Sequence, residues 1–202
     1  MEPPQKMSAI ILAGGKSARM KENKPLLPVQ GIPLIQKVAR NLEPHFQEIL
    51  ISAQAREMFA FLPYRVILDK EPGQGPLMGI LSGLAASANP TCFMIACDIP
   101  EIDAAFLQRM MSYTYQYEIV VPVAGEGKFE PLFAFYHKGL IPRIEDLLKQ
   151  QTRQVFQLFP LARTKYLPLE DRNWFYNLNN MEDYRRYIER LSPGGTAGES
   201  NF

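Results

Sequence analysis

A glycine pair follows the first apolar run of the chain, and basic residues come next. The run covers residues 7–12 and is followed by Ala13, Gly14 and Gly15. The cations Lys16, Arg19 and Lys24 follow within ten residues. Glycines let backbone N–H groups approach phosphate oxygens closely, and nearby cations neutralise the phosphate charge. The segment predicts an anion-binding loop; the alternative is a glycine turn beside a solvated charged surface.

Neither of two common phosphate-binding motifs accounts for this loop. A P-loop requires glycine where Ile10 stands, and the dinucleotide fingerprint requires Gly-x-Gly-x-x-Gly, which Gly14-Gly15-Lys16 does not supply. A second glycine-rich segment, residues 73–79, could admit a flat ligand at Gly75 and Gly79. Its alternative is a flexible turn before the following helix. Each segment is weak evidence by itself.

Ser52, Asp69 and Asp98 each stand where an apolar run ends. A buried carboxylate is unfavourable without a partner, so an ion pair or a helix cap is the alternative for each acid. Asp98 is followed by Ile99-Pro100, and proline keeps the preceding residue extended, which predicts a carboxylate presented at a strand end. Proteins usually hold Mg²⁺ with one or two carboxylates and substrate phosphate oxygens. Asp98 is therefore the predicted Mg²⁺ ligand.

These residues need a sheet to bring them together, and the hydrophobic pattern predicts one. Expected strands cover residues 7–12, 48–52, 65–68, 91–97, 118–123 and 132–136. Expected helices cover residues 33–42, 77–88, 140–148 and 180–191, with one capped by Asp103 and a weaker one from Thr152. Alternating strands and helices predict a three-layer αβα Rossmann-like fold with a mostly parallel central sheet. Ligands of such sheets bind at the carboxyl ends of the strands.

Length and composition narrow the class of protein. The chain has 202 residues, 47% of them hydrophobic, which suits one domain over residues 7–191 with flexible termini at 1–6 and 192–202. A net charge of +1 without a basic block argues against nucleic-acid binding. No apolar segment approaches the ~20 residues of a membrane span. Cys92 and Cys97 are expected to be buried, reduced thiols on opposite faces of a strand, which favours the cytoplasm.

Taken together and in order, the motifs resemble the MobA-like nucleotidyltransferases, and among them the molybdenum cofactor guanylyltransferases. The resemblance covers nearly all of residues 7–190. It rests on residues 12–20 (Leu-Ala-Gly-Gly-Lys-Ser-Ala-Arg-Met), Lys24-Pro25-Leu26-Leu27, Gly31-Ile32-Pro33-Leu34, Asp69, Gly75-Pro76-Leu77-Met78-Gly79, Cys97-Asp98-Ile99-Pro100 and Asn177-Leu178-Asn179-Asn180.

The resemblance implies a reaction. GMP would pass from GTP to the terminal phosphate of molybdopterin, with pyrophosphate released and Mg²⁺ as cofactor. The product would be the guanine dinucleotide form of the molybdenum cofactor, and molybdoenzyme-maturation proteins would be partners. The attacking phosphate is already ionised near neutral pH, because its second pKa is about 6, so no general base is required. The chain has only His45 and His137, and neither lies in a motif.

The resemblance also implies a role for each matching residue. Arg19, Lys24 and Asp98 would be catalytic, and Asp98 would bind both Mg²⁺ and the nucleotide. Asn177 and Asn179 would bind the acceptor. The nucleotide would contact Leu12, Ala13, Gly14, Gly15, Lys24, Ser52, Asp69, Gly75 and Asp98, with Ser52 and Asp69 near the guanine and the ribose.

Four positions depart from the family pattern. Lys21 replaces a glycine, Asn23 an aspartate, Ser52 an asparagine and Glu130 an acceptor-side histidine. Ser52 leaves open which residue reads the base. Two alternatives therefore stay open: a cytidylyl- or sugar-phosphate nucleotidyltransferase, and a non-catalytic nucleotide-binding regulator of the same fold. Lys24 and Asp98 argue against the regulator, which needs neither a metal ligand nor a cation at the α-phosphate.

Overall fold

The computed structural model describes residues 6–14, 23–71, 73–125, 127–170 and 173–192. Gly15, Arg19 and Lys21 lie outside these ranges, as do all but Lys6 and Ser192 of the two predicted flexible termini. Among the helices within these ranges, none is long and apolar enough to cross a membrane.

Seven strands of the described chain form one sheet in the order β5-β4-β1-β6-β8-β7-β9. Their bounds are β1 Met7–Leu12, β4 Glu48–Ala53, β5 Arg65–Leu68, β6 Thr91–Ala96, β7 Ile119–Val123, β8 Phe133–His137 and β9 Thr164–Pro168. The short strands β2 Pro28–Val29 and β3 Ile32–Pro33 form a separate hairpin. Strands β1, β4, β5 and β6 are mutually parallel, β7 and β9 pair in parallel, and β8 runs antiparallel to both neighbours. The predicted mostly parallel α/β fold is confirmed.

Strand β9 was not predicted from the sequence. It forms the edge of the sheet, pairs only with β7 among the described strands, and buries Leu167 but leaves Tyr166 exposed. A strand covered on one side only does not require a continuous apolar run, and residues 164–168 do not contain one.

Five α-helices of the described chain are α1 Leu34–Leu42, α2 Pro76–Ala86, α3 Ala104–Tyr113, α4 Ile141–Lys149 and α5 Met181–Leu191. The predicted cap is confirmed, because Asp103 accepts a hydrogen bond from the Phe106 N–H at 2.6 Å. At the start of α5, Asn180 forms a capping box with Asp183. The weaker helix expected from Thr152 is instead a 3₁₀ helix, η4 Val155–Leu161, which contains Pro160. Proline removes a backbone donor and so disfavours the α-helical hydrogen-bond pattern.

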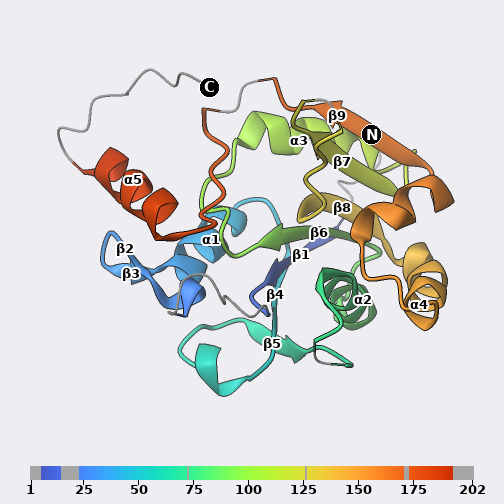
Figure 1. Ribbon diagram of the computed structural model, residues 1–202, viewed down its shortest axis with the longest axis horizontal. Helices are drawn as coiled ribbons and strands as arrows, with labels where there is room; N and C mark the ends of the chain where they lie inside the picture. Colours follow the sequence, from blue (N-terminus) through green and yellow to red (C-terminus); the bar gives the residue numbers. More distant parts are fainter. Residues whose placement is uncertain (1–5, 15–22, 72, 126, 171–172, 193–202) are drawn as a thin grey trace.

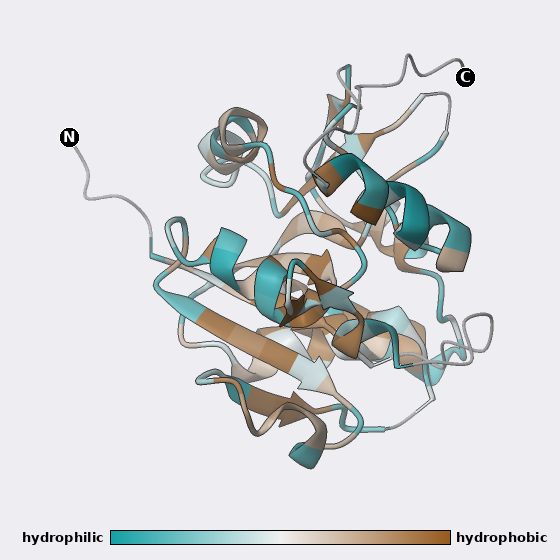
Figure 2. Cartoon of the chain, turned by 90° about the vertical axis from the view of Figure 1, so that its left-hand side faces the viewer, coloured by the Kyte–Doolittle hydropathy of each residue, from teal (hydrophilic) through white to brown (hydrophobic). Residues whose placement is uncertain are grey.

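Helices cover both faces of the sheet (Figure 1). One core cluster includes Val38 of α1 and Phe106 of α3, and the other includes Leu81 of α2 and Ile144 of α4. The hydropathy colouring in Figure 2 shows the apolar residues concentrated in the strands between these layers. Cys97 belongs to the first cluster and Cys92 to the second, so the two free thiols are buried on opposite sides of the sheet, as predicted.

Helix α5 lies apart from both layers and beside the β2–β3 hairpin (Figure 1). Its Tyr187 packs in a third cluster with Val29 and Leu34 and with Leu178, which precedes the helix. The Tyr187 hydroxyl donates to Glu101, a residue close to the end of β6. The contact ties the late part of the chain to the strand end that carries Asp98.

Candidate active site

The register of the sheet aligns the ends of three strands. Leu12 at the end of β1 pairs with Ser52 of β4 on one side and with Ala96 of β6 on the other. The loop after β1 stays in this row, because the Ala13 N–H donates to the Ser52 carbonyl at 2.8 Å. Leu132 joins the row from the opposite direction, since it precedes the antiparallel β8 and its carbonyl accepts from the Ala96 N–H at 2.8 Å.

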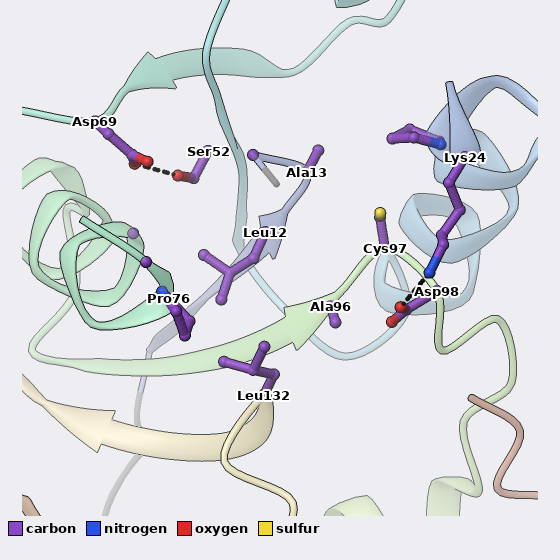
Figure 3. A pocket seen from close by; sticks show the side chains of 14 residues that line it. Leu12, Ala13, Lys24, Ser52, Asp69, Pro76, Ala96, Cys97, Asp98 and Leu132 are labelled. Carbon is purple, nitrogen blue, oxygen red and sulfur yellow. Dashed lines mark hydrogen bonds and ion pairs between the residues drawn. The ribbon is translucent and has the colours of Figure 1, made fainter. Parts of the chain in front are cut away.

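A cavity of about 320 Å³ opens at these strand ends. Its described lining is shown in Figure 3 and consists of Leu12, Ala13, Gly14, Lys24, Pro25, Ser52, Asp69, Gly75, Pro76, Gly79, Ala96, Cys97, Asp98 and Leu132. Every nucleotide-site residue predicted within the described ranges is therefore in one cavity. Leu132 was missed, because no local pattern announces a residue that reaches the site from an antiparallel strand.

Ser52 and Asp69 form one end of the cavity (Figure 3). The Ser52 hydroxyl donates to Asp69 Oδ1 at 2.9 Å, and Ser52 is only 1% exposed. Burial raises the pKa of Asp69 above its ordinary value, and the bond from Ser52 partly opposes this shift. A Cβ at Gly79 would crowd Leu12 at 3.1 Å and would be in ordinary contact with Ser52 Oγ at 3.6 Å. Gly79 therefore serves the close packing of α2.

Gly75 has a backbone role of its own. It precedes α2 with a φ of +80°, a conformation that glycine adopts without strain. This turn sends the first turn of α2 toward the cavity, where Pro76 and Gly79 line the wall. Both the ligand-approach and the helix-start interpretations of residues 73–79 are consistent with this placement.

Lys24 and Asp98 form the other end of the cavity (Figure 3). Lys24 is in the 3₁₀ helix η1 Lys24–Leu26, and its Nζ lies 2.9 Å from Asp98 Oδ2. The two side chains are 13% and 18% exposed, so Asp98 is more enclosed than its position before Ile99-Pro100 led us to expect. Burial and the charge of Asp98 raise the pKa of the Cys97 thiol to about 12, which keeps this neighbour neutral.

The free oxygen of Asp98 suits a divalent cation. Asp98 Oδ1 is buried and has no hydrogen-bond partner within the described chain. Leaving a buried acceptor unpaired costs about 1–3 kcal/mol, and more for a charged group. The described residues contain no group of three or more His, Cys, Asp or Glu side chains that could hold a metal. A single carboxylate together with substrate phosphates and water is nevertheless a usual Mg²⁺ site, so the residues fit this ion.

The two predicted acceptor residues lie close to Asp98 in the backbone but do not line the cavity. The Leu178 N–H donates to the Asp98 carbonyl at 2.9 Å, which brings the segment 177–179 against the end of β6. Asn177 Oδ1 is buried without a hydrogen-bond partner among the described residues, whereas Asn179 is exposed. The two asparagines therefore have different environments.

No histidine lines the described part of the cavity. His137 lies at the other end of the strands, where it ends β8 and pairs with Thr91 at the start of β6, and its Nδ1 accepts from the Gly139 N–H at 3.0 Å. His45 follows α1. Glu130, which takes the position of an acceptor-side histidine in the resemblance, is bound through its backbone N–H to the Pro122 carbonyl at 3.0 Å. The site offers charge and hydrogen bonds for its chemistry.

Residues 9–164 match the family model described as a MobA-like NTP transferase domain. A protein of Carboxydothermus hydrogenoformans called "Probable molybdenum cofactor guanylyltransferase" is 33% identical over 93% of this chain and 98% of its own length. One of the same name from Pelotomaculum thermopropionicum is 36% identical over 87% of this chain and 89% of its own length.

The fold also matches a solved structure. Molybdopterin-guanine dinucleotide biosynthesis protein A from Archaeoglobus fulgidus superposes with a TM-score of 0.78, covering 91% of this chain and 98% of that one. At 22% identity this likeness concerns the fold.

Proposed function

The chain belongs to the MobA-like NTP transferase family, and from this premise we propose that it transfers GMP from GTP to the terminal phosphate of molybdopterin. The product is the guanine dinucleotide form of the molybdenum cofactor, and pyrophosphate is released. The names of the relatives support the acceptor and the base. The observation that carries the transfer chemistry is the Lys24–Asp98 pair at one end of a glycine-walled cavity.

The reaction is a displacement at the α-phosphorus of GTP. An oxygen of the acceptor phosphate forms a bond to this phosphorus, and the bond between the α-phosphorus and the oxygen bridging to the β-phosphate breaks. The attacking oxygen carries no proton to remove, because the second pKa of a phosphate monoester is about 6. The protein then has to orient the two phosphates and neutralise their charge, which agrees with a cavity whose described lining holds no histidine.

Asp98 and Lys24 divide this task. Asp98 Oδ1 would hold Mg²⁺, and the ion would supply charge neutralisation on the triphosphate oxygens. Lys24 Nζ, now paired with Asp98 Oδ2, is placed to donate to an α-phosphate oxygen as negative charge develops there. Arg19, outside the described ranges, keeps its proposed role as a further cation at the phosphates.

The Ser52–Asp69 pair lies at the other end of the cavity and would take the nucleoside. Guanine presents N1–H and 2-amino donors, which a carboxylate accepts, and the Ser52 hydroxyl holds Asp69 Oδ1 in place at 2.9 Å. Ribose hydroxyls could use the same carboxylate. The acceptor side falls to Asn177 and Asn179, beside Asp98.

The setting of the reaction is also part of the proposal. Two buried free thiols suit a reducing compartment, so we place the protein in the cytoplasm. Its product has to reach apoenzymes that use it, which makes molybdoenzyme-maturation proteins its natural partners. GTP and molybdopterin are its substrates.

Turnover of the purified protein tests the proposal. Molybdopterin is offered with GTP, ATP, CTP or UTP in the presence of Mg²⁺, and pyrophosphate release and product mass are measured. We expect a guanine dinucleotide product from GTP and little turnover with the other three. Preference for CTP would favour the cytidylyl alternative. Tight GTP binding without pyrophosphate release would favour a non-catalytic regulator.

A further inference from the structure

Two buried side-chain oxygens in the described chain have no hydrogen-bond partner: one lines the cavity, and the other lies on a segment bonded to it. They are Asp98 Oδ1 and Asn177 Oδ1. The residues are distant in sequence, but their backbones are joined where the Leu178 N–H donates to the Asp98 carbonyl at 2.9 Å. Two orphan acceptors therefore occur on adjoining segments of the same strand end.

These two atoms cannot satisfy one another, because each is an acceptor. The neighbouring cation does not resolve the matter either, since Lys24 Nζ is bound to the other oxygen of Asp98 at 2.9 Å. A divalent cation can be bound by both oxygens at once, because it accepts lone pairs from each. Carboxylate and amide carbonyl oxygens are ligands that hard cations such as Mg²⁺ accept.

We propose that Asn177 Oδ1 is a second protein ligand of the divalent cation held by Asp98. The inference rests on the proposed function, because it adds a ligand to the metal of that reaction. It changes the role of Asn177 from acceptor binding to metal binding, and it makes the metal site a joint product of the end of β6 and the segment before α5.

The surrounding contacts hold Asn177 in place for this role. Leu178 is 1% exposed and packs with Val29, Leu34 and Tyr187, while the Tyr187 hydroxyl donates to Glu101, three residues beyond Asp98. The segment is thus fixed on both sides of the backbone bond between Leu178 and Asp98. A ligand held in advance loses little entropy when the ion binds.

Asn179 provides a matched control. It is the same residue type two positions away, yet it is exposed, and its Nδ2 donates to the Asn177 carbonyl at 3.4 Å. An aspartate at either position adds the same charge near Asp98. Only at position 177 would the new oxygen replace a metal ligand.

Titration with Mn²⁺, followed by electron paramagnetic resonance of the free ion, tests the proposal without turnover. The wild type, Asn177→Leu, Asn177→Asp and Asn179→Asp are compared with and without α,β-methylene GTP. We expect about tenfold weaker Mn²⁺ binding for Asn177→Leu, which is about 1.4 kcal/mol. We expect Asn177→Asp to bind Mn²⁺ about tenfold more tightly than wild type, and Asn179→Asp to bind it within about twofold of wild type.

Thermal unfolding supplies a second readout and checks the fold. In EDTA, Asn177→Leu should unfold at the wild-type temperature or above it, since the change removes a buried unpaired oxygen. Saturating Mn²⁺ should raise the midpoint less for this variant than for wild type, because a ligand stabilises the native state according to its affinity.

The outcomes separate the inference from the function on which it rests. Unchanged Mn²⁺ affinity in both Asn177 variants would overturn the inference and leave the proposed reaction standing. Equal tightening by Asn177→Asp and Asn179→Asp would also overturn it, since charge alone would explain the gain. Failure of the wild type to bind Mn²⁺ in the presence of the GTP analogue would remove the metal from the proposed function as well.

Discussion

Lys24 faces a carboxylate in the structure but a phosphate in the proposed reaction. Its bond to Asp98 therefore contributes little to binding GTP, and its charge matters most as the α-phosphorus accepts the incoming oxygen. Lys24→Ala should lower kcat about 100-fold, the loss typical of removing one charge-stabilising donor, and weaken GTP binding by much less.

Steady-state kinetics and calorimetric titration with GTP measure the two quantities. Lys37→Ala is the matched control, because Lys37 is similarly enclosed at 16% exposure and pairs with Glu101 at 3.1 Å, away from the described cavity lining. It should keep kcat. Equal losses of kcat and GTP affinity in Lys24→Ala would contradict the role given to Lys24.

Asp69 is the second residue whose role a single substitution can decide. Its carboxylate is half-buried and held by Ser52, so guanine can donate to it while adenine, which lacks the N1–H and 2-amino donors, leaves it unpaired. The mismatch costs ~1–3 kcal/mol, or roughly 5- to 150-fold in affinity. Asp69→Asn should reduce the preference for GTP over ATP in calorimetric titrations. A uniform loss for both nucleotides would assign Asp69 to the ribose.

At the scale of the elements, a hydrogen bond from Tyr187 of α5 to Glu101 joins this helix to the strand end that carries Asp98. Tyr187 is buried, and its hydroxyl donates to Glu101. Tyr187→Phe keeps the ring but loses the bond, which should lower the free energy of unfolding by about 0.5–1.5 kcal/mol. It should also raise the KM for molybdopterin and weaken Mn²⁺ binding, since the displaced segment 177–179 carries Asn179 and the proposed metal ligand Asn177.

Tyr184→Phe is the comparison for this effect. Tyr184 is on the same helix, but its hydroxyl donates to the Pro28 carbonyl in the β2–β3 hairpin. Urea unfolding and steady-state kinetics should show a stability loss in both variants and a raised acceptor KM only in Tyr187→Phe. The same KM change in both would mean that α5 acts through general stability.

Strands and helices were easier to predict from the sequence than the contacts between distant residues. Apolar runs ending in Leu12, Asp69 and Asp98 predicted buried strands and a site at their carboxyl ends, because burial and strand ends leave a local signature. The pairing of Lys24 with Asp98 left none, since it joins residues 74 positions apart. The edge strand β9, half exposed, also lacked the apolar run that marks the other strands.

At the scale of the whole molecule, the reactivity of the two buried thiols measures how well each side of the sheet is closed to solvent. Burial raises the pKa of Cys92 to about 11 and that of Cys97 to about 12. At pH 8 an unfolded thiol, with a pKa near 8.5, has at least about 100 times more thiolate than either. Reaction with a disulfide reagent should be slower by at least that factor in the native protein than in urea. Fast native labelling of the Cys92→Ala variant would show that the cavity side opens by itself.

The order of the strands has a consequence for synthesis on the ribosome. At the centre of the sheet β1 pairs with β6, so the backbone pairing of Leu12 is incomplete until Ala96 has been synthesised. Such distant pairing is slow compared with local folding, because a long loop has to close first. The nascent chain therefore exposes its first apolar strand for much of its translation, and the cavity floor forms only after β6 emerges. Asn177 emerges after all of the described cavity lining, so a chain that ends before it lacks the side chain that we assign to the metal.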